Sequence, residues 1–140
     1  MAAINTYLNF NGNTEEAFNF YKSVFGGEFQ TLQRMKETPD CDKLPADQQD
    51  KIMHVALPIG SNILMGTDVP PTMPAVQFGT NSSICISPDS EEEATRLFNA
   101  LGEGGNIGMP LQKMFWGDLF GFFTDKFGVQ WMVNYHAEQA

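Results

Sequence analysis

The stretches TEEAFNFYKSVFGG (14–27) and SEEEATRLFNALGEGG (90–105) decide the fold of this chain. In each stretch, apolar residues recur at the three- and four-residue spacing of one helical face, and glycines follow the last of them. An offset of 77 residues aligns the two stretches, pairing Ala17 with Ala94, Phe20 with Leu97, Tyr21 with Phe98, Val24 with Leu101 and Gly27 with Gly104. The sequence therefore predicts two matching helices and, with them, an internal repeat.

Short runs of β-branched and aromatic residues flank both predicted helices, separated by turns of glycine, proline and asparagine. They predict strands at 4–10, 28–35, 51–58 and 62–66 in the first half, and at 82–87, 107–114, 119–124 and 129–135 in the second. The charged segment 36–50 contains two prolines and predicts a surface loop. Each half therefore has the order β-α-β-β-β.

The ends of the predicted elements carry recognisable polar residues. Asn13 or Thr14 is the expected cap of the first helix, and Ser90 with Glu93 has the spacing of a capping box at the second. Asp68 follows a predicted strand, where we expect an exposed carboxylate.

The repeat also predicts the domain organisation. We expect one domain, residues 1–140, in which a proline-rich connector (69–80) joins a first βαβββ unit (4–68) to a second (81–135). One open sheet cannot cover both of its faces, so the two units are expected to lie beside each other with a helix on each outer face. The predicted fold is α+β, an open, curved, mixed sheet with a central groove, and that groove is the expected ligand site.

Composition restricts the classes of partner. Hydrophobic residues make up 42% of the chain, enough for a sizeable core. The 17 acidic residues against 8 basic ones give a net charge of -9, so neither nucleic acid nor a membrane surface is expected as a partner. The opening residues predict a strand and not a signal peptide. Cys41 and Cys85 fit no disulfide or metal pattern, and we expect free thiols in the cytoplasm.

Several segments resemble one known group of proteins. They are YLNFNG (7–12), EA (16–17), FY (20–21), FGGE (25–28), MHVA (53–56), LM (64–65), FWG (115–117), FG (120–121) and TDKFGVQWMVN (124–134). They are similar to the PhnB-like proteins of the vicinal oxygen chelate superfamily, which includes glyoxalase I, bleomycin and fosfomycin resistance proteins and extradiol dioxygenases. The resemblance covers nearly the whole chain and implies the glyoxalase/bleomycin resistance/dioxygenase fold. It also implies a homodimer, because partner chains commonly complete the groove in this superfamily.

The resemblance places four positions where active superfamily members bind a divalent metal through His, Glu or Gln, one on the first and one on the last strand of each unit. In this chain they fall on Thr6, Ser83, Met132 and either Leu64 or Met65. Hydroxyls and thioethers are poor ligands for such ions, so no metal and no cofactor are expected, and a metal held by other ligands is the alternative. The superfamily's reactions use that metal as a Lewis acid, so whether this chain is an enzyme stays open.

Other residues offer chemistry at the predicted groove. His54, on a central strand, is a candidate ligand or general base, with a hydrogen-bonded core histidine as the alternative. Trp116, followed by glycine, is a candidate stacking platform beside Asp118, whereas we expect Phe115 in the core. Alternation along the last strand assigns Gln130 and Met132 to the groove. The candidate groove residues are Thr6, His54, Met65, Ser83, Trp116, Asp118, Gln130 and Met132.

These observations favour a protein that binds a small apolar or aromatic molecule in the groove, as the resistance proteins do. A metal-dependent lyase, isomerase or dioxygenase with non-standard ligands is the first alternative, and a homodimeric interaction module is the second. Some members of the group carry a name derived from a ubiquinone-pathway methyltransferase. No glycine-rich segment opens a helix after a strand in this sequence to bind the methyl donor, so methyl transfer is not expected.

Overall fold

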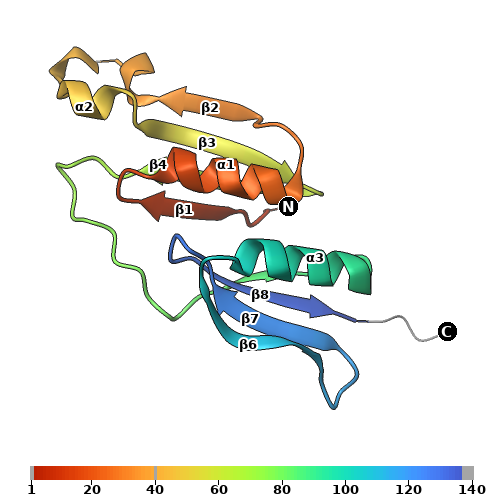
Figure 1. Cartoon of the computed structure of the whole chain (residues 1–140). Helices are drawn as coiled ribbons and strands as arrows, with labels where there is room; N and C mark the ends of the chain where they lie inside the picture. The colour runs from red at the N-terminus through yellow and green to blue at the C-terminus, as the bar shows by residue number, and fades with distance from the viewer. Residues whose placement is uncertain (1, 40, 137–140) are drawn as a thin grey trace. The chain divides into compact units, whose positions relative to one another are not determined.

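The computed structural model describes residues 2–39 and 41–136, with the side chain of Cys41 outside the described part. The chain divides into two compact units, Met1–Gln77 and Phe78–Ala140, and each is described by itself (Figure 1). The boundary falls within the expected connector. None of the helices described has the length and apolar character needed to cross a membrane.

The first unit has the predicted order β-α-β-β-β. Its elements are β1 (Thr6–Phe10), α1 (Thr14–Phe25), β2 (Thr31–Arg34), β3 (Ile52–Ile59) and β4 (Asn62–Asp68). The strands form a mixed sheet in the order β1-β4-β3-β2, in which β1 and β4 are parallel and the other neighbours antiparallel. The strand expected at 28–35 is shorter than predicted, and its end at Arg34 coincides with a shift of register against β3.

Helix α1 packs on β3 and β4 and covers one face of this sheet. Phe18 of α1 meets Phe10 of β1 edge to face, with ring centroids 6.4 Å apart, and both side chains are fully buried. The Phe18 ring also lies over Gly66, where an added Cβ would come within 2.5 Å of it. A glycine in β4 is what lets the helix approach the strand this closely.

Asp68, at the end of β4, is buried and not exposed as expected. Its Oδ1 accepts hydrogen bonds from the backbone N–H of Thr14 (3.0 Å) and from the Thr14 hydroxyl (2.6 Å), and its Oδ2 accepts one from the N–H of Ile52 (2.8 Å). The side chain of Asn13 makes no capping bond. The carboxylate of a distant strand therefore satisfies the start of α1, where a local cap was predicted.

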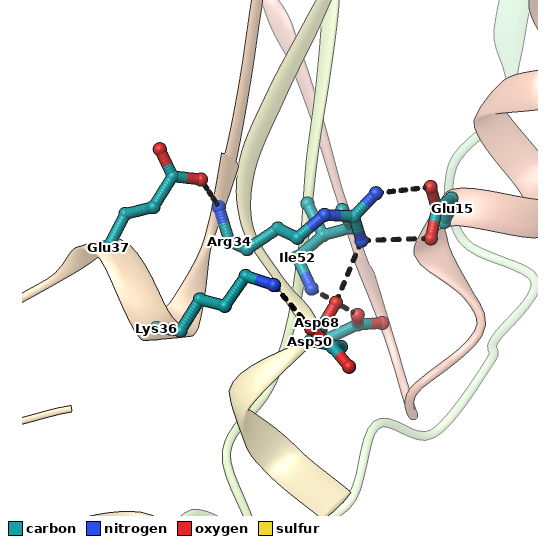
Figure 2. Close-up of polar contacts among 7 residues, drawn as sticks. All are labelled: Glu15, Arg34, Lys36, Glu37, Asp50, Ile52 and Asp68. Atoms are coloured by element: carbon teal, nitrogen blue, oxygen red, sulfur yellow. Dashed lines mark hydrogen bonds and ion pairs between the residues drawn. The ribbon is translucent and has the colours of Figure 1, made fainter. Parts of the chain in front are cut away.

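The segment 36–50 is more ordered in structure than the predicted loop. It contains two short 3₁₀ turns, η1 (Met35–Glu37) and η2 (Cys41–Lys43), and one helical turn, α2 (Ala46–Gln49). Figure 2 shows how it is tied to the unit: Arg34 binds both oxygens of Glu15 on α1, at 3.0 and 2.6 Å, and donates to the carbonyl of Asp50 at 2.9 Å. Lys36 pairs with the Asp50 carboxylate at 2.9 Å. These contacts hold both ends of the segment beside α1.

The Arg34–Glu15 pair predicts a pH-dependent contribution to stability. The hydrogen bonds from Arg34 hold the pKa of Glu15 below its ordinary value. A carboxyl with a lowered pKa in the folded state stabilises the fold above its unfolded pKa, and that contribution is lost as pH falls through the folded pKa. Arg34→Gln is therefore expected to lower the free energy of unfolding at neutral pH and to differ less from the wild type in acid, as measured by urea denaturation at both pH values. An equal difference at the two pH values would contradict this assignment.

The second unit repeats the same order. Its elements are β5 (Ile84–Ile86), α3 (Glu91–Gly102), β6 (Asn106–Lys113), β7 (Leu119–Thr124) and β8 (Gln130–Tyr135). The sheet order is β5-β8-β7-β6, with β5 and β8 parallel. Helices α1 and α3 begin and end 77 residues apart, which confirms the repeat predicted from the helical stretches.

Local caps and a second buried aspartate hold this unit together. Ser90 caps α3 through a bond from the N–H of Glu93 (3.0 Å), while the Glu93 carboxylate reaches the N–H of Asp89 and not that of Ser90, so the predicted capping box is shifted by one residue. Asp125 accepts from the indole N–H of the buried Trp131 (2.8 Å) and from the N–H groups of Phe127 and Val129. This carboxylate organises the turn between β7 and β8.

Candidate functional site

Each sheet has one face under its helix and an opposite face, here called the open face. Side chains alternate between the two along a strand. Thr6 lies opposite the buried Leu64 in the register of β1 with β4, so both belong to the helix-covered face. The expectation that Thr6 lines the open face is therefore wrong, and its neighbour Tyr7 holds that place.

The register gives the residues that stand at the centre of each open face on the first and last strands. Tyr7 pairs with Met65 in the first unit, and Cys85 pairs with Met132 in the second. Tyr7 precedes the first residue of α1 by seven positions, whereas Cys85 precedes that of α3 by six. The strand-to-helix turn is thus one residue shorter in the second unit, and the offset counted on the helices points to the wrong side of β1.

These four side chains do not suit a catalytic divalent metal. A phenol, a thiol and two thioethers lack the imidazole and carboxylate ligands that such ions prefer. Within residues 2–39 and 42–136, no three His, Cys, Asp or Glu side chains are grouped so that they could hold a metal ion. Partial burial also raises the pKa of the Cys85 thiol, which keeps it in the neutral form that binds metals poorly. The residues present do not fit the superfamily's metal.

His54 of β3 forms a polar pair with Tyr7 on the open face of the first unit. The Tyr7 hydroxyl and His54 Nδ1 are 3.1 Å apart, and the two rings are stacked with centroids 5.7 Å apart. Tyr7 lies on β1 and His54 on β3, so the pair reaches across β4 above Met65 and Thr67. A phenol bonded to an imidazole can donate, accept or relay a proton, which is the chemistry of an acid–base pair.

The predicted residues of β8 occupy the open face of the second unit. Trp131 and Val133 are buried toward α3, and Met132 alternates with them and lies opposite Cys85 and Phe122. Gln130 donates to the carbonyl of Ser82 at 2.6 Å, and Ser83 is exposed just before β5. The open face here is therefore apolar at its centre and polar beside the start of β5.

Four aromatic rings, which we call the aromatic row, continue this apolar surface. Consecutive centroids lie 4.9, 6.3 and 6.2 Å apart along Phe115, Trp116, Phe120 and Phe122. Trp116 is half exposed, as a stacking platform requires. Phe115 is 96% exposed, so the prediction that it packs in the core is wrong. Its position in the turn between β6 and β7 carries it beyond the reach of α3.

A polar cluster, here called the Asp118 cluster, stands at the Trp116 end of the aromatic row. Asp118 Oδ1 is bonded to His136 Nδ1, and its Oδ2 accepts from Asn134 Nδ2 at 3.1 Å. Hydrogen bonds from His136, Asn134 and Trp116 hold the pKa of Asp118 below its ordinary value. The site residues Trp116 and Asp118 are thus brought together with a histidine and an amide.

Five residues of the Tyr7–His54 pair, the aromatic row and the Asp118 cluster were not predicted from the sequence: Tyr7, Phe120, Phe122, Asn134 and His136. Asn134 and His136 continue the two-residue spacing of Gln130 and Met132. Extending that alternation to the end of β8 and one residue beyond would have found both. Tyr7 was missed because the resemblance placed the first-strand position on Thr6, one residue earlier. Phe120 has no local signal that separates a surface aromatic residue from a core one.

Comparisons with known proteins agree with this description of the fold. The model of a family described as 3-demethylubiquinone-9 3-methyltransferase matches residues 2–134. Protein YjdN of Escherichia coli is 31% identical over 97% of both chains. The structure of protein PA1353 from Pseudomonas aeruginosa has a TM-score of 0.87 at 45% identity and covers 99% of this chain and 100% of its own. The PhnB protein of Bacillus cereus has a TM-score of 0.78 at 27% identity, covering 96% and 99%.

More distant structures share the fold alone. A glyoxalase-related enzyme from Fulvimarina pelagi has a TM-score of 0.62 at 16% identity, covering 97% of this chain and 89% of its own. The fosfomycin resistance protein FosX from Mesorhizobium loti has a TM-score of 0.57 at 10% identity, covering 98% and 94%. The predicted α+β fold of two βαβββ units is confirmed.

Proposed function

This chain belongs to the family described as 3-demethylubiquinone-9 3-methyltransferase, the PhnB-like family within the glyoxalase and bleomycin resistance superfamily, and we propose that it binds a small planar aromatic molecule. The aromatic row is the observation that carries the proposal. Trp116 and Phe122 are 49% and 39% exposed, on a face whose centre is lined by Met132. Exposed rings beside a flexible thioether suit the stacking of a planar ligand.

We do not extend the methyl transfer in the family's description to this chain. A methyl donor is commonly bound where a glycine-rich turn follows a strand and opens a helix. The turns that lead from a strand into the two longer helices, α1 and α3, are NGN (11–13) and SPDS (87–90), and Gly12 is their single glycine. The residues at the centres of the open faces are poor ligands for the superfamily's metal, so we also propose that binding proceeds without that metal.

Fluorescence of the neutral apolar dye N-phenyl-1-naphthylamine tests the proposal. Its emission is expected to rise on binding to the wild-type chain. Met132→Glu puts a charge at the centre of the apolar face and is expected to weaken the affinity at least about tenfold, because an unpaired charge is costly to bury under a ligand.

Met73→Glu is the matched control, because Met73 is exposed in the connector outside both sheets. It is expected to leave the affinity unchanged. The proposal fails if the wild type does not enhance the dye's emission, or if the two Met→Glu variants weaken binding equally.

The Tyr7–His54 pair favours a second candidate function, a proton-transfer reaction of the isomerase or lyase type. In it His54 removes a proton next to a substrate carbonyl. In an isomerase the proton is returned to the same or a neighbouring carbon, and in a lyase a leaving group departs from the neighbouring carbon and takes up a proton. When the protein is incubated with 2-hydroxyacetophenone in deuterated water, deuterium should then appear at the carbon next to the carbonyl. NMR measures this exchange. Loss of this exchange in His54→Gln supports the candidate, and absence of exchange above the buffer rate with the wild type removes it.

We also keep as proposals that the chain forms homodimers and works in the cytoplasm. The aromatic row is a contiguous exposed apolar surface, with Phe115 96% exposed at its end, and such a surface favours association of two copies. Sedimentation equilibrium of the whole chain tests the dimer, and a single species of one-chain mass at all concentrations would contradict it.

A further inference from the structure

We propose that His136 and Asp118 form a hydrogen-bonding dyad that binds the hydroxyl group of a phenol while the phenol's ring lies on Trp116. The inference rests on the proposed function and names the class of its ligand. It assigns a role to His136, which lies directly after β8.

The Asp118 cluster fixes which nitrogen of the imidazole is available. The lowered pKa of Asp118 keeps its carboxylate ionised near neutral pH, and an ionised carboxylate can only accept hydrogen bonds. His136 Nδ1 must therefore carry the proton in their mutual bond. In the neutral imidazole the other nitrogen, Nε2, then has a lone pair and acts as an acceptor.

Burial within the cluster points to the imidazole and not the carboxylate as the ligand-binding group. The side chain of Asp118 is 14% exposed, and protein donors occupy both of its oxygens. The side chain of His136 is 66% exposed. Asp118 is thus a positioning residue, and His136 presents the accessible polar atom.

The same carboxylate brings the imidazole close to the aromatic row. The cluster meets the row at Phe120, which lies opposite Asn134, and Asn134 donates to Asp118. The ring centroid of Trp116 is 6.3 Å from that of Phe120, which places Trp116 on the side of the row that adjoins the cluster. A planar ligand on Trp116 would therefore have its edge near His136.

The negative charge of the protein favours a ligand with a neutral hydroxyl group over an anionic ligand. The net charge of -9 and the adjacent Asp118 carboxylate repel phosphate and carboxylate ligands. A phenol is neutral near pH 7, stacks through its ring and donates one hydrogen bond. That donor matches the single acceptor that the dyad offers.

Displacement of N-phenyl-1-naphthylamine by 2-naphthol and by 2-methylnaphthalene tests the inference. The two compounds have similar shape, but only the naphthol donates a hydrogen bond. The wild type is expected to bind 2-naphthol about tenfold more tightly, the value of one good hydrogen bond. His136→Phe should bind the two compounds equally, and His136→Gln should keep part of the preference because its amide oxygen can accept.

The outcomes separate the dyad from the proposed function. Dye binding with no preference for the naphthol in the wild type, or a preference that persists in His136→Phe, overturns the dyad and leaves the proposed function standing. Failure of the wild type to bind the dye overturns both. In His136→Phe, unchanged affinity for 2-methylnaphthalene alongside weaker binding of 2-naphthol would support the dyad, since loss of the apolar surface would weaken both.

Discussion

Replacement of Asp68 by alanine is expected to lower the free energy of unfolding by about 4 kcal/mol, the largest effect of any single polar substitution in the first unit. The substitution leaves three buried donors without their acceptor, the N–H and hydroxyl of Thr14 and the N–H of Ile52. A buried donor without a partner costs about 1–3 kcal/mol. Urea denaturation followed by far-ultraviolet circular dichroism measures the change.

Asp47→Ala is the control, because Asp47 is exposed on α2, and a change within about 0.5 kcal/mol is expected there. Asp68→Asn should fall between the two, since the amide keeps the shape and one acceptor oxygen. A loss of less than about 1 kcal/mol in Asp68→Ala would mean that water replaces the carboxylate at the start of α1. The role assigned to Asp68 would then be wrong.

Asp125→Ala is expected to lower the free energy of unfolding by about 3 kcal/mol through the second unit. The indole N–H of Trp131 loses its acceptor at a site where the ring is 1% exposed, and the backbone N–H groups of Phe127 and Val129 lose the Asp125 carboxylate oxygen to which they donate. Tryptophan fluorescence during urea denaturation is the suitable measurement, because both tryptophans, Trp116 and Trp131, lie in this unit.

Asp89→Ala serves as the control for an exposed aspartate in the same unit. It removes no acceptor from a buried donor and should change the midpoint very little. If Asp125→Ala and Asp89→Ala had the same small effect, the carboxylate would not be what holds Trp131 in place. Substitutions in the aromatic row could then be interpreted without allowing for an effect on the β7–β8 turn.

The sequence predicted the helices well because their signal is local. The apolar spacing and following glycines lie within each helical stretch, and the structure begins and ends both helices within those stretches. The order of the elements followed from the repeat. These features need no knowledge of which distant residues meet.

What could not be predicted depends on contacts between distant segments. Asp68 is buried because it accepts hydrogen bonds from Thr14, which is 54 residues away. No sequence pattern near Asp68 predicts that partner. The face of Thr6 depends on a turn that differs by one residue between the units, and one residue reverses every side chain of a strand. The Asp118 cluster joins a turn to the end of β8, so its members are separated along the chain.

The two helices also differ in when their first turns can be completed as the chain is made. Ser90 lies beside α3, so that helix has its cap as soon as it leaves the ribosome. Helix α1 must wait for Asp68, 54 residues later, which takes on the order of several seconds at typical rates of synthesis. A helix of 12 residues is marginal without such support. The first unit is therefore expected to stay open to proteases and chaperones until β4 arrives, whereas α3 can form ahead of its sheet.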